Sequence, residues 1–245
     1  MKTTGELVFL SDQDDAWFPN KIEYMQGIAE QNPNALVLMN DAALTDGHLN
    51  EVGLTKIGQI QSAGFRMEDF VMGCCCAVRR ELLDICMPIP MGFRAHDNWL
   101  VEIAEGLDAK LVERRVLQYY RRHEANESQF AANSITRVSR IGAFFHSAKK
   151  IFDPEVALIE QRKIEQLKIF SKGIDNIKKN APREFTTKLC RLRKAVAMRS
   201  NWMEKRVEIR QRSIVPRTVS VIRLLKRGEY ATYGGFKAFL RDLVG

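Results

Sequence analysis

Apolar residues in the first half of the chain follow two different patterns, which predict strands interleaved with helices. Short continuous apolar runs predict buried strands at residues 6–10, 34–41 and 110–123. Apolar positions three or four residues apart predict intervening helices at residues 19–31, 79–86 and 97–107. Strands that alternate with helices imply a mostly parallel sheet covered by helices, so we expect an α/β fold.

The pattern changes after about residue 134, where long amphipathic stretches replace the alternation. Asp153 and Pro154 form a typical helix start, and the KKNAP segment (178–182) interrupts the apolar stripe that follows. We therefore expect an antiparallel helical hairpin over residues 153–209. A short helix is expected to start at Pro216. A last amphipathic helix is expected to place one apolar face on a membrane, made by Phe236, Phe239, Leu240 and Leu243.

The distribution of charge supports a division into residues 1–133 and a basic α-helical region, residues 134–245. Residues 1–130 carry 12 Lys and Arg against 20 Asp and Glu, whereas residues 131–245 carry 26 against 10. The net charge of +8 therefore combines an acidic front half with a strongly basic back half. Basic helices suit nucleic acid, an anionic membrane surface or plain solvated faces. Nucleic-acid binding is disfavoured, because aromatic residues do not interleave with the basic ones.

Several classes of protein are excluded or disfavoured by composition. No uncharged apolar stretch is long enough to span a membrane, and the N-terminal apolar segment is too short for a signal peptide. The five cysteines form no CxxC pair, so we expect small buried thiols and no structural zinc site. These features predict a cytoplasmic protein, with peripheral contact to the inner face of the plasma membrane as an extension of that prediction.

An acidic cluster, Asp12, Asp14 and Asp15 in FLSDQDDAWFPNK, directly follows the first predicted strand. Ligands of parallel α/β sheets bind beyond the carboxyl ends of strands. Carboxylates two residues apart can face one point, and their oxygens suit Mg²⁺ or Mn²⁺. The alternative is an acidic helix N-terminus, in which Asp15 complements the dipole of the helix that begins near Pro19.

The series of motifs resembles the family 2 glycosyltransferases, in particular the bacterial rhamnosyltransferase-like branch that builds O-antigen and related surface polysaccharides. The D-x-D motif is followed by another Asp, a Trp, a Pro and a Lys, and further blocks occur in family order across nearly the whole chain. The matching blocks are FLSDQDDAWFPNKIE, MNDAALTDG, VMGCCCAVRREL, RAHDNWL, YYRRHEAN and YATYGGFKAFLRDL. The resemblance implies a partial GT-A-type, Rossmann-like domain and a metal-dependent, inverting transfer of a sugar.

The resemblance also implies roles for individual residues. Asp97, at the start of a predicted helix, would be the catalytic base that takes the proton of the acceptor hydroxyl. The metal ligands would be Asp14, Asp12 and His123. The substrate-binding residues would be Asp12, Trp17, Asp41, Gly73, His96 and Trp99. From the residues alone, Asp97 could equally cap its helix, and both tryptophans could be ordinary packing residues.

The implied partners are a nucleotide-sugar donor, dTDP-rhamnose in this branch, and a glycan or lipid-linked acceptor. In the family the D-x-D strand is not the first strand, so we expect an N-terminally incomplete transferase with an open sheet edge beside residues 6–10. Two alternatives stay open: an inactive or fragmentary glycosyltransferase remnant, and a basic nucleic-acid-binding protein.

Overall fold

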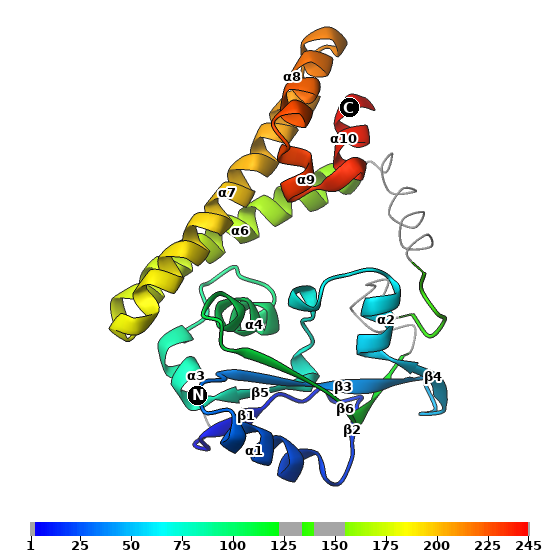
Figure 1. Ribbon diagram of the computed structural model, residues 1–245, viewed down its shortest axis with the longest axis vertical. Helices are drawn as coiled ribbons and strands as arrows, with labels where there is room; N and C mark the ends of the chain where they lie inside the picture. Colours follow the sequence, from blue (N-terminus) through cyan, green and yellow to red (C-terminus); the bar gives the residue numbers. More distant parts are fainter. Residues whose placement is uncertain (1–2, 123–133, 140–154, 245) are drawn as a thin grey trace.

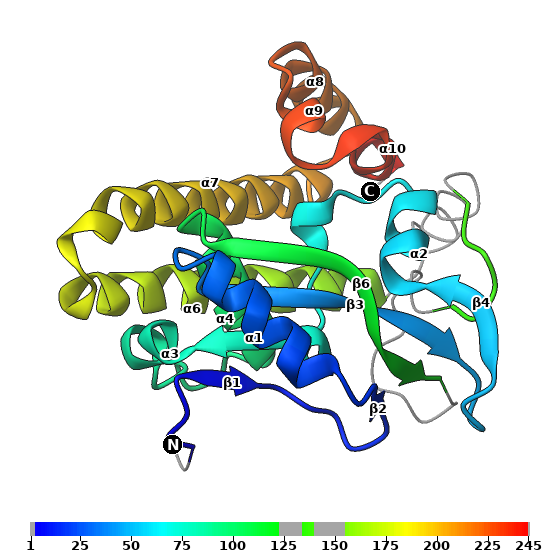
Figure 2. The ribbon, with the colours of Figure 1, turned by 60° about the horizontal axis from the view of Figure 1, so that its bottom comes forward.

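The structure, a computed structural model, describes residues 3–122, 134–139 and 155–244. Its centre is a six-stranded sheet in the order β1-β5-β3-β6-β2, with β4 added beside β3 (Figures 1 and 2). The three predicted strands are present, and three further short strands were not predicted. The bounds are β1 (Leu7–Phe9), β2 (Ala16–Trp17), β3 (Val37–Thr45), β4 (Glu51–Thr55), β5 (Cys76–Arg79) and β6 (Lys110–Arg121).

The prediction of a mostly parallel sheet is wrong. Among the described strands, only β3 and β6 pair in parallel, whereas the β1–β5, β3–β5, β3–β4 and β2–β6 pairs are antiparallel. The three predicted strands, β1, β3 and β6, do run in one direction. Each strand that was not predicted runs in the opposite direction, and β5 separates β1 from β3. The fold is thus mixed α/β with a partly parallel sheet.

Helices cover both faces of the sheet, which explains why every residue of β3 is buried. Alternate residues of β3 serve opposite faces, so Leu38 packs with Met25 of α1 on one side. Val37 and Met39 join the larger cluster on the other side, together with residues of α2, α3 and α4. The bounds are α1 (Lys21–Gln31), α2 (Lys56–Ser62), α3 (Arg80–Cys86) and α4 (His96–Gly106).

The predicted helical hairpin is confirmed as α6 (Glu155–Asn180) and α7 (Thr186–Arg210), joined by the short 3-10 helix Arg183–Phe185. The expected helix start at Asp153–Pro154 lies outside the described residues. Buried residues of both hairpin helices belong to the same hydrophobic cluster as the sheet. The basic region is therefore packed on the α/β region through a shared core.

Two glycines let the hairpin approach α4 closely. A Cβ on Gly173 of α6 would lie 2.3 Å from the ring of Trp99, and one on Gly106 of α4 would lie 2.6 Å from Leu192 of α7. Such distances leave no room for a side chain on either glycine. The hairpin is fitted to α4 along its length.

The C-terminal helices are α8 (Ile214–Lys226), α9 (Glu229–Tyr233) and α10 (Gly235–Val244). Pro216 is the third residue of α8, so this helix begins two residues earlier than predicted. These three helices form a third apolar cluster with α7, which contains Trp202, Ile209, Val221, Leu224, Tyr230 and Ala238.

The expected membrane-facing side of α10 is wrong in part, because Phe239 and Leu243 pack against this C-terminal cluster. Phe236 is exposed, so the apolar residues of α10 do not form one free face. Four of the five cysteines are buried as predicted, but Cys190 is exposed on α7. No helix within the described ranges has the length and apolar character that crossing a bilayer requires.

The open sheet edge expected beside residues 6–10 is present among the described residues. There, β1 pairs with β5 on one side and has no strand on its other side. An unpaired strand edge offers backbone donors and acceptors to another strand.

The close contact between α6 and α4 predicts unequal effects of two Gly→Ala substitutions. Gly173→Ala should lower the free energy of unfolding by about 1–3 kcal/mol, because the added methyl overlaps Trp99. Gly27→Ala in α1 is the matched control, since nothing lies within 4 Å of its Cβ position. It should be neutral or stabilise by up to about 1 kcal/mol. Urea unfolding measures both, and equal effects of the two substitutions would contradict the packing described above.

Candidate functional site

Two chain segments meet at one edge of the sheet because β1 and β5 are antiparallel. Phe9 pairs with Ala77, and the Leu10 amide donates to the Cys76 carbonyl at 3.0 Å. Continuing this register brings the residues that follow β1 opposite the short 3-10 helix Gly73–Cys75 that precedes β5. Accordingly, one ligand atom from each of Asp12, Asp15 and Cys74 lies within 4.8 Å of the other two. This sheet edge is the candidate site.

The Cys74 side chain acts in this group as a neutral thiol. A hydrogen bond with Cys75, together with burial and the nearby charges of Cys75 and Asp15, raises the pKa of Cys74 far above its usual range. A thiol binds metals as the thiolate, and Mg²⁺ and Mn²⁺ prefer oxygen ligands. The carboxylates of Asp12 and Asp15 are therefore the atoms of this group that fit such an ion.

Asp15 is held by β6 and does not cap the first helix. Its carboxylate accepts hydrogen bonds from Gln118 Nε2 and from the Arg121 amide, both at 3.2 Å. Helix α1 begins at Lys21, and its N-cap, Asn20, makes no side-chain capping bond. Burial raises the pKa of Asp15 to about 6, and the neighbouring carboxylates of Asp14 and Asp12 add to the increase. Asp15 is therefore not a capping residue of α1.

Asp12 lies within electrostatic range of three other predicted site residues. Partial burial raises the pKa of Asp12. The nearby carboxylates of Asp14 and Asp97 raise it further, whereas His96 lowers it. Gly73 explains how Asp97 comes so near, because a Cβ at Gly73 would lie 3.3 Å from the Asp97 Cβ. The first turn of α4 therefore presents His96 and Asp97 to the carboxylates that follow β1.

Lys21 contacts three parts of the site: the Cys74 turn, β6 and Trp17. Its ammonium donates to the Cys74 carbonyl at 2.9 Å and to Gln118 Oε1, and it lies 4.1 Å from the centroid of the Trp17 ring. The residue is 1% exposed, and burial lowers its pKa. A buried cation needs such partners, so Lys21 ties α1 to β6 and to the Cys74 turn.

Asp41 has a structural role, contrary to the expectation that it binds substrate. Its carboxylate accepts from the Ile57 amide at 2.9 Å and the Ala42 amide at 2.8 Å, and further from the Thr55 side chain and the Lys56 amide. Four donors occupy about all the acceptor positions that a carboxylate has. Asp41 therefore anchors the start of α2.

The two tryptophans differ in their surroundings. Trp99 is 1% exposed, its Nε1 donates to the Cys86 carbonyl at 3.0 Å, and its ring packs on Phe93 and Phe170. The expectation that Trp99 contacts substrate is wrong, because it belongs to the core. Trp17 is half-buried against Phe9 and Lys21, beside the carboxylates. His123 lies outside the described residues.

Sequence reasoning did not assign a site role to Cys74, Lys21 or Lys56, which the structure brings to this edge. It also did not pair Asp15 with Asp12. Lys56 is 3% exposed, and burial lowers its pKa to about 8. Lys56 lies within electrostatic range of Cys75, Arg122, Cys74 and Asp41, so it is near the cysteine turn. Lys21 belongs to the motif that follows the D-x-D residues, but neither lysine lies in a local pattern that would have indicated burial.

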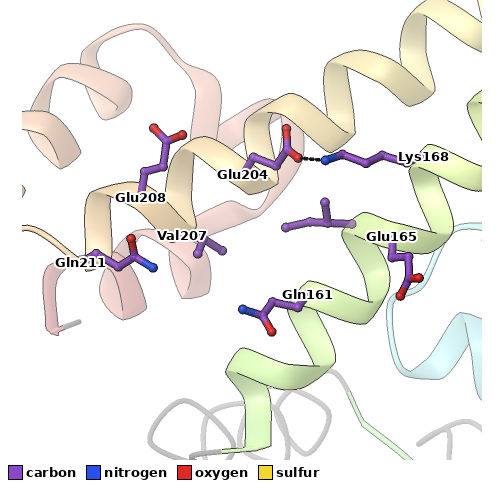
Figure 3. Close-up of a pocket in the computed structure, with 8 residues that line it drawn as sticks. Gln161, Glu165, Lys168, Glu204, Val207, Glu208 and Gln211 are labelled. Carbon is purple, nitrogen blue, oxygen red and sulfur yellow. Dashed lines mark ion pairs between the residues drawn. The ribbon is translucent and has the colours of Figure 1, made fainter.

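A separate groove of about 450 Å³ lies between α6 and α7 (Figure 3). Its polar lining includes Glu165, Glu204 and Glu208, and an ion pair between Lys168 and Glu204 crosses it. None of the residues predicted for a site lines this groove. We therefore place the candidate site at the sheet edge.

Comparison of the chain with models of protein families gives no match, and comparison with curated proteins gives none either. The likeness to glycosyltransferases therefore remains an interpretation of the motifs. The geometry of the sheet edge is the structural basis for a proposed function.

The raised pKa of Asp15 predicts a pH-dependent loss of stability. Its pKa is about 6 in the folded protein and 3.8 ordinarily, so the folded state binds more protons between these values. The free energy of unfolding should therefore fall by about 1–2 kcal/mol as the pH rises from about 4 to about 6, allowing for solvent screening.

Urea unfolding at several pH values, with a chelator present, measures this effect. Asp15→Asn should flatten the slope over that pH range. Asp84→Asn, which alters an exposed carboxylate on α3, should retain it. Identical slopes in the wild type and Asp15→Asn would contradict the assignment.

Proposed function

We propose that this chain carries the metal-binding and acceptor-activating part of an inverting glycosyltransferase of GT-A type, acting on a nucleotide-sugar donor. One observation carries the proposal. Asp12, Asp14, Asp15 and Asp97 come from two separate elements and gather around the Cys74 turn, where burial and mutual repulsion raise the pKa values of Asp12 and Asp15. Carboxylates crowded in this way are costly unless a cation or a proton compensates them.

The residues present fit a hard divalent ion such as Mg²⁺ or Mn²⁺. Asp12 and Asp15 offer oxygen ligands, Asp14 adds charge beside them, and Cys74 stays a neutral donor. When bound, such an ion supplies neutralisation of the charge that develops on a leaving diphosphate. The resemblance implies Asp14, Asp12 and His123 as metal ligands. The structure instead groups Asp15 with Asp12 and Cys74.

Asp97 is the best candidate for the base that takes a proton from the acceptor hydroxyl. It is partly exposed at the first turn of α4, and one of its oxygens accepts from the neighbouring Asn98 amide at 2.9 Å. The charge of Asp97 raises the pKa of Asp12, so the two carboxylates are near each other. An acceptor bound between them would lie close to both the base and the donor. His96, exposed beside it, offers a donor for an acceptor hydroxyl.

The identity of the sugar rests on the resemblance alone, and dTDP-rhamnose is the donor that it suggests. A glycan or lipid-linked acceptor is the matching partner. The structure offers less support for a nucleic-acid-binding protein, because Arg206, Arg210 and Arg241 of the basic region are paired with carboxylates.

The first experiment is a calorimetric titration of Mn²⁺ and dTDP into the protein. Asp14→Asn and Asp15→Asn should each weaken Mn²⁺-dependent dTDP binding by at least about tenfold, whereas Asp84→Asn should not. The relative size of the two losses tells whether Asp14 or Asp15 holds the ion. Unchanged binding in both variants would reduce the cluster to a structural feature.

The second experiment tests the base. Asp97→Asn should reduce sugar transfer or donor hydrolysis by roughly 10²–10⁴-fold with little change in dTDP affinity. The Asp84→Asn variant again serves as the control. Activity of Asp97→Asn within a few-fold of wild type would place the base elsewhere. Binding of Mn²⁺ and dTDP without any turnover in the wild type would favour the inactive remnant.

A further inference from the structure

Helix α8 buries one side and leaves an adjoining apolar stripe exposed. Val221 and Leu224 are buried in the C-terminal cluster with Trp202 and Tyr230. Next to this buried side, five large aliphatic residues are 43% to 74% exposed, namely Ile214, Val215, Val219, Ile222 and Leu225. Scattered exposed aliphatic residues are ordinary, but five on one short helix are not.

These five residues share one face of the helix. At 100° per residue, they span an arc of about 140°. Figure 1 places α8 at the end of the molecule away from the sheet, and Figure 2 shows the same separation after rotation. The stripe is thus available to a partner without obstruction of the carboxylate edge.

The charges on α8 are of one sign. The helix contains Arg217, Arg223 and Lys226 and no Asp or Glu, and Arg227 follows it directly. Arg223 and Lys226 are exposed beside the stripe. A helix that combines an aliphatic face with flanking cations is typical of segments that lie in the interface of an anionic bilayer.

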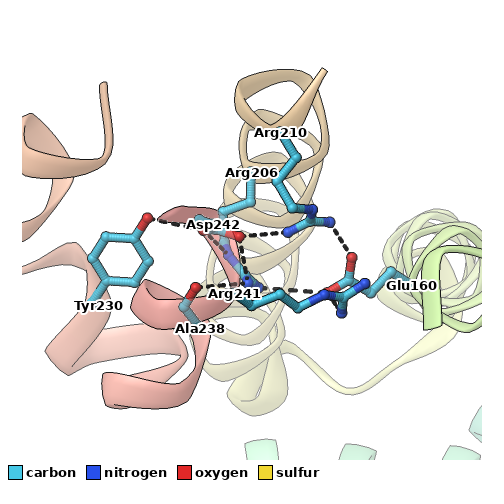
Figure 4. A network of polar contacts seen from close by, with 7 residues as sticks. All are labelled: Glu160, Arg206, Arg210, Tyr230, Ala238, Arg241 and Asp242. Carbon is cyan, nitrogen blue, oxygen red and sulfur yellow. Dashed lines mark hydrogen bonds and ion pairs between the residues drawn. The ribbon is translucent and has the colours of Figure 1, made fainter. Parts of the chain in front are cut away.

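The nearby arginines of α7 and α10 are used differently (Figure 4). Asp242, which is fully buried, accepts from Arg206 at 2.6 Å, Arg210 at 2.6 Å and the Tyr230 hydroxyl at 2.9 Å. Glu160 accepts from Arg241 at 2.7 Å and from Arg210. This network fixes α10 and the hairpin together, so the cations that remain on the surface of this end include those of α8.

We propose that the exposed stripe of α8 binds the surface of an anionic phospholipid bilayer, with the helix axis parallel to the membrane. Ile214, Val215, Val219, Ile222 and Leu225 would enter the acyl boundary, while Arg223 and Lys226 contact lipid phosphates. A second copy of the chain is disfavoured as the occupant, because pairing two α8 helices would bring like charges together. Nucleic acid is disfavoured because the stripe is aliphatic and offers no stacking platform.

Sedimentation with lipid vesicles tests this proposal. The wild-type protein should bind vesicles of phosphatidylcholine mixed with phosphatidylglycerol at low salt, release at high salt, and bind phosphatidylcholine alone weakly. Val219→Gln with Ile222→Gln should weaken binding at least about tenfold, because two aliphatic side chains are lost from the interface. Arg223→Gln with Lys226→Gln should weaken it roughly thirtyfold and reduce the dependence on salt.

Leu158→Gln with Met198→Gln is the matched control, because these residues of α6 and α7 are each 48% exposed but lie outside the stripe. This control should bind vesicles as the wild type does. Equal binding to neutral and anionic vesicles, or equal losses in the control and the stripe variant, would overturn the proposal. So would a wild-type protein that ignores anionic vesicles but self-associates through the stripe, or that binds duplex DNA through Arg223 and Lys226.

Discussion

The antiparallel pairing of β1 with β5 is the constraint on which the candidate site depends. With Phe9 opposite Ala77, the chain leaving β1 and the chain entering β5 must meet at one edge. That meeting brings the Asp12 carboxylate to the Cys74 thiol. The site then grows outward, since β6 supplies the donors that hold Asp15 and the glycine before Cys74 admits the first turn of α4. If the neighbour of β1 were parallel to it, the chain entering that neighbour would lie at the opposite edge of the sheet, away from Asp12.

Burial of charge accompanies this geometry and has a cost that the surroundings must offset. Lys21 lies beneath the carboxylates with two hydrogen bonds and an aromatic face, which together replace the water it has lost. Asp41, two strands from β1, is surrounded by backbone donors at the start of α2. The two groups illustrate different outcomes. The carboxylate of Asp41 has four hydrogen-bond donors within the chain, whereas those of Asp12 and Asp15 lie beside other carboxylates.

Strong periodicity made most of the fold predictable, and short segments made the rest unpredictable. The hairpin helices α6 and α7 have enough residues to show a helical period, and β3 begins within a continuous apolar run. Strand β5 has four residues and begins at the third of three consecutive cysteines, so nothing in its composition indicated a strand or its direction. Missing β5 led to the wrong prediction of a mostly parallel sheet. In the site, Asp12, Asp14 and Asp97 stood out because they follow or begin an element. The true surroundings of Asp41 and Trp99 depend on Ile57 and Gly173, which lie far away in sequence and give no local sign of contact.

The two glycine contacts of α4 give the hairpin a mechanical connection to the carboxylates. Gly173 of α6 lies against Trp99 of α4, and Gly106 of α4 lies against Leu192 of α7. Both ends of α4 therefore pack closely on the hairpin, because a glycine stands at each contact. Asp97 occupies the first turn of that same helix, two residues before Trp99. A displacement of the hairpin relative to the sheet should therefore move α4 as well, and so change the distance between Asp97 and Asp12. The basic hairpin is thus connected, through α4, to the carboxylate that is proposed as the base.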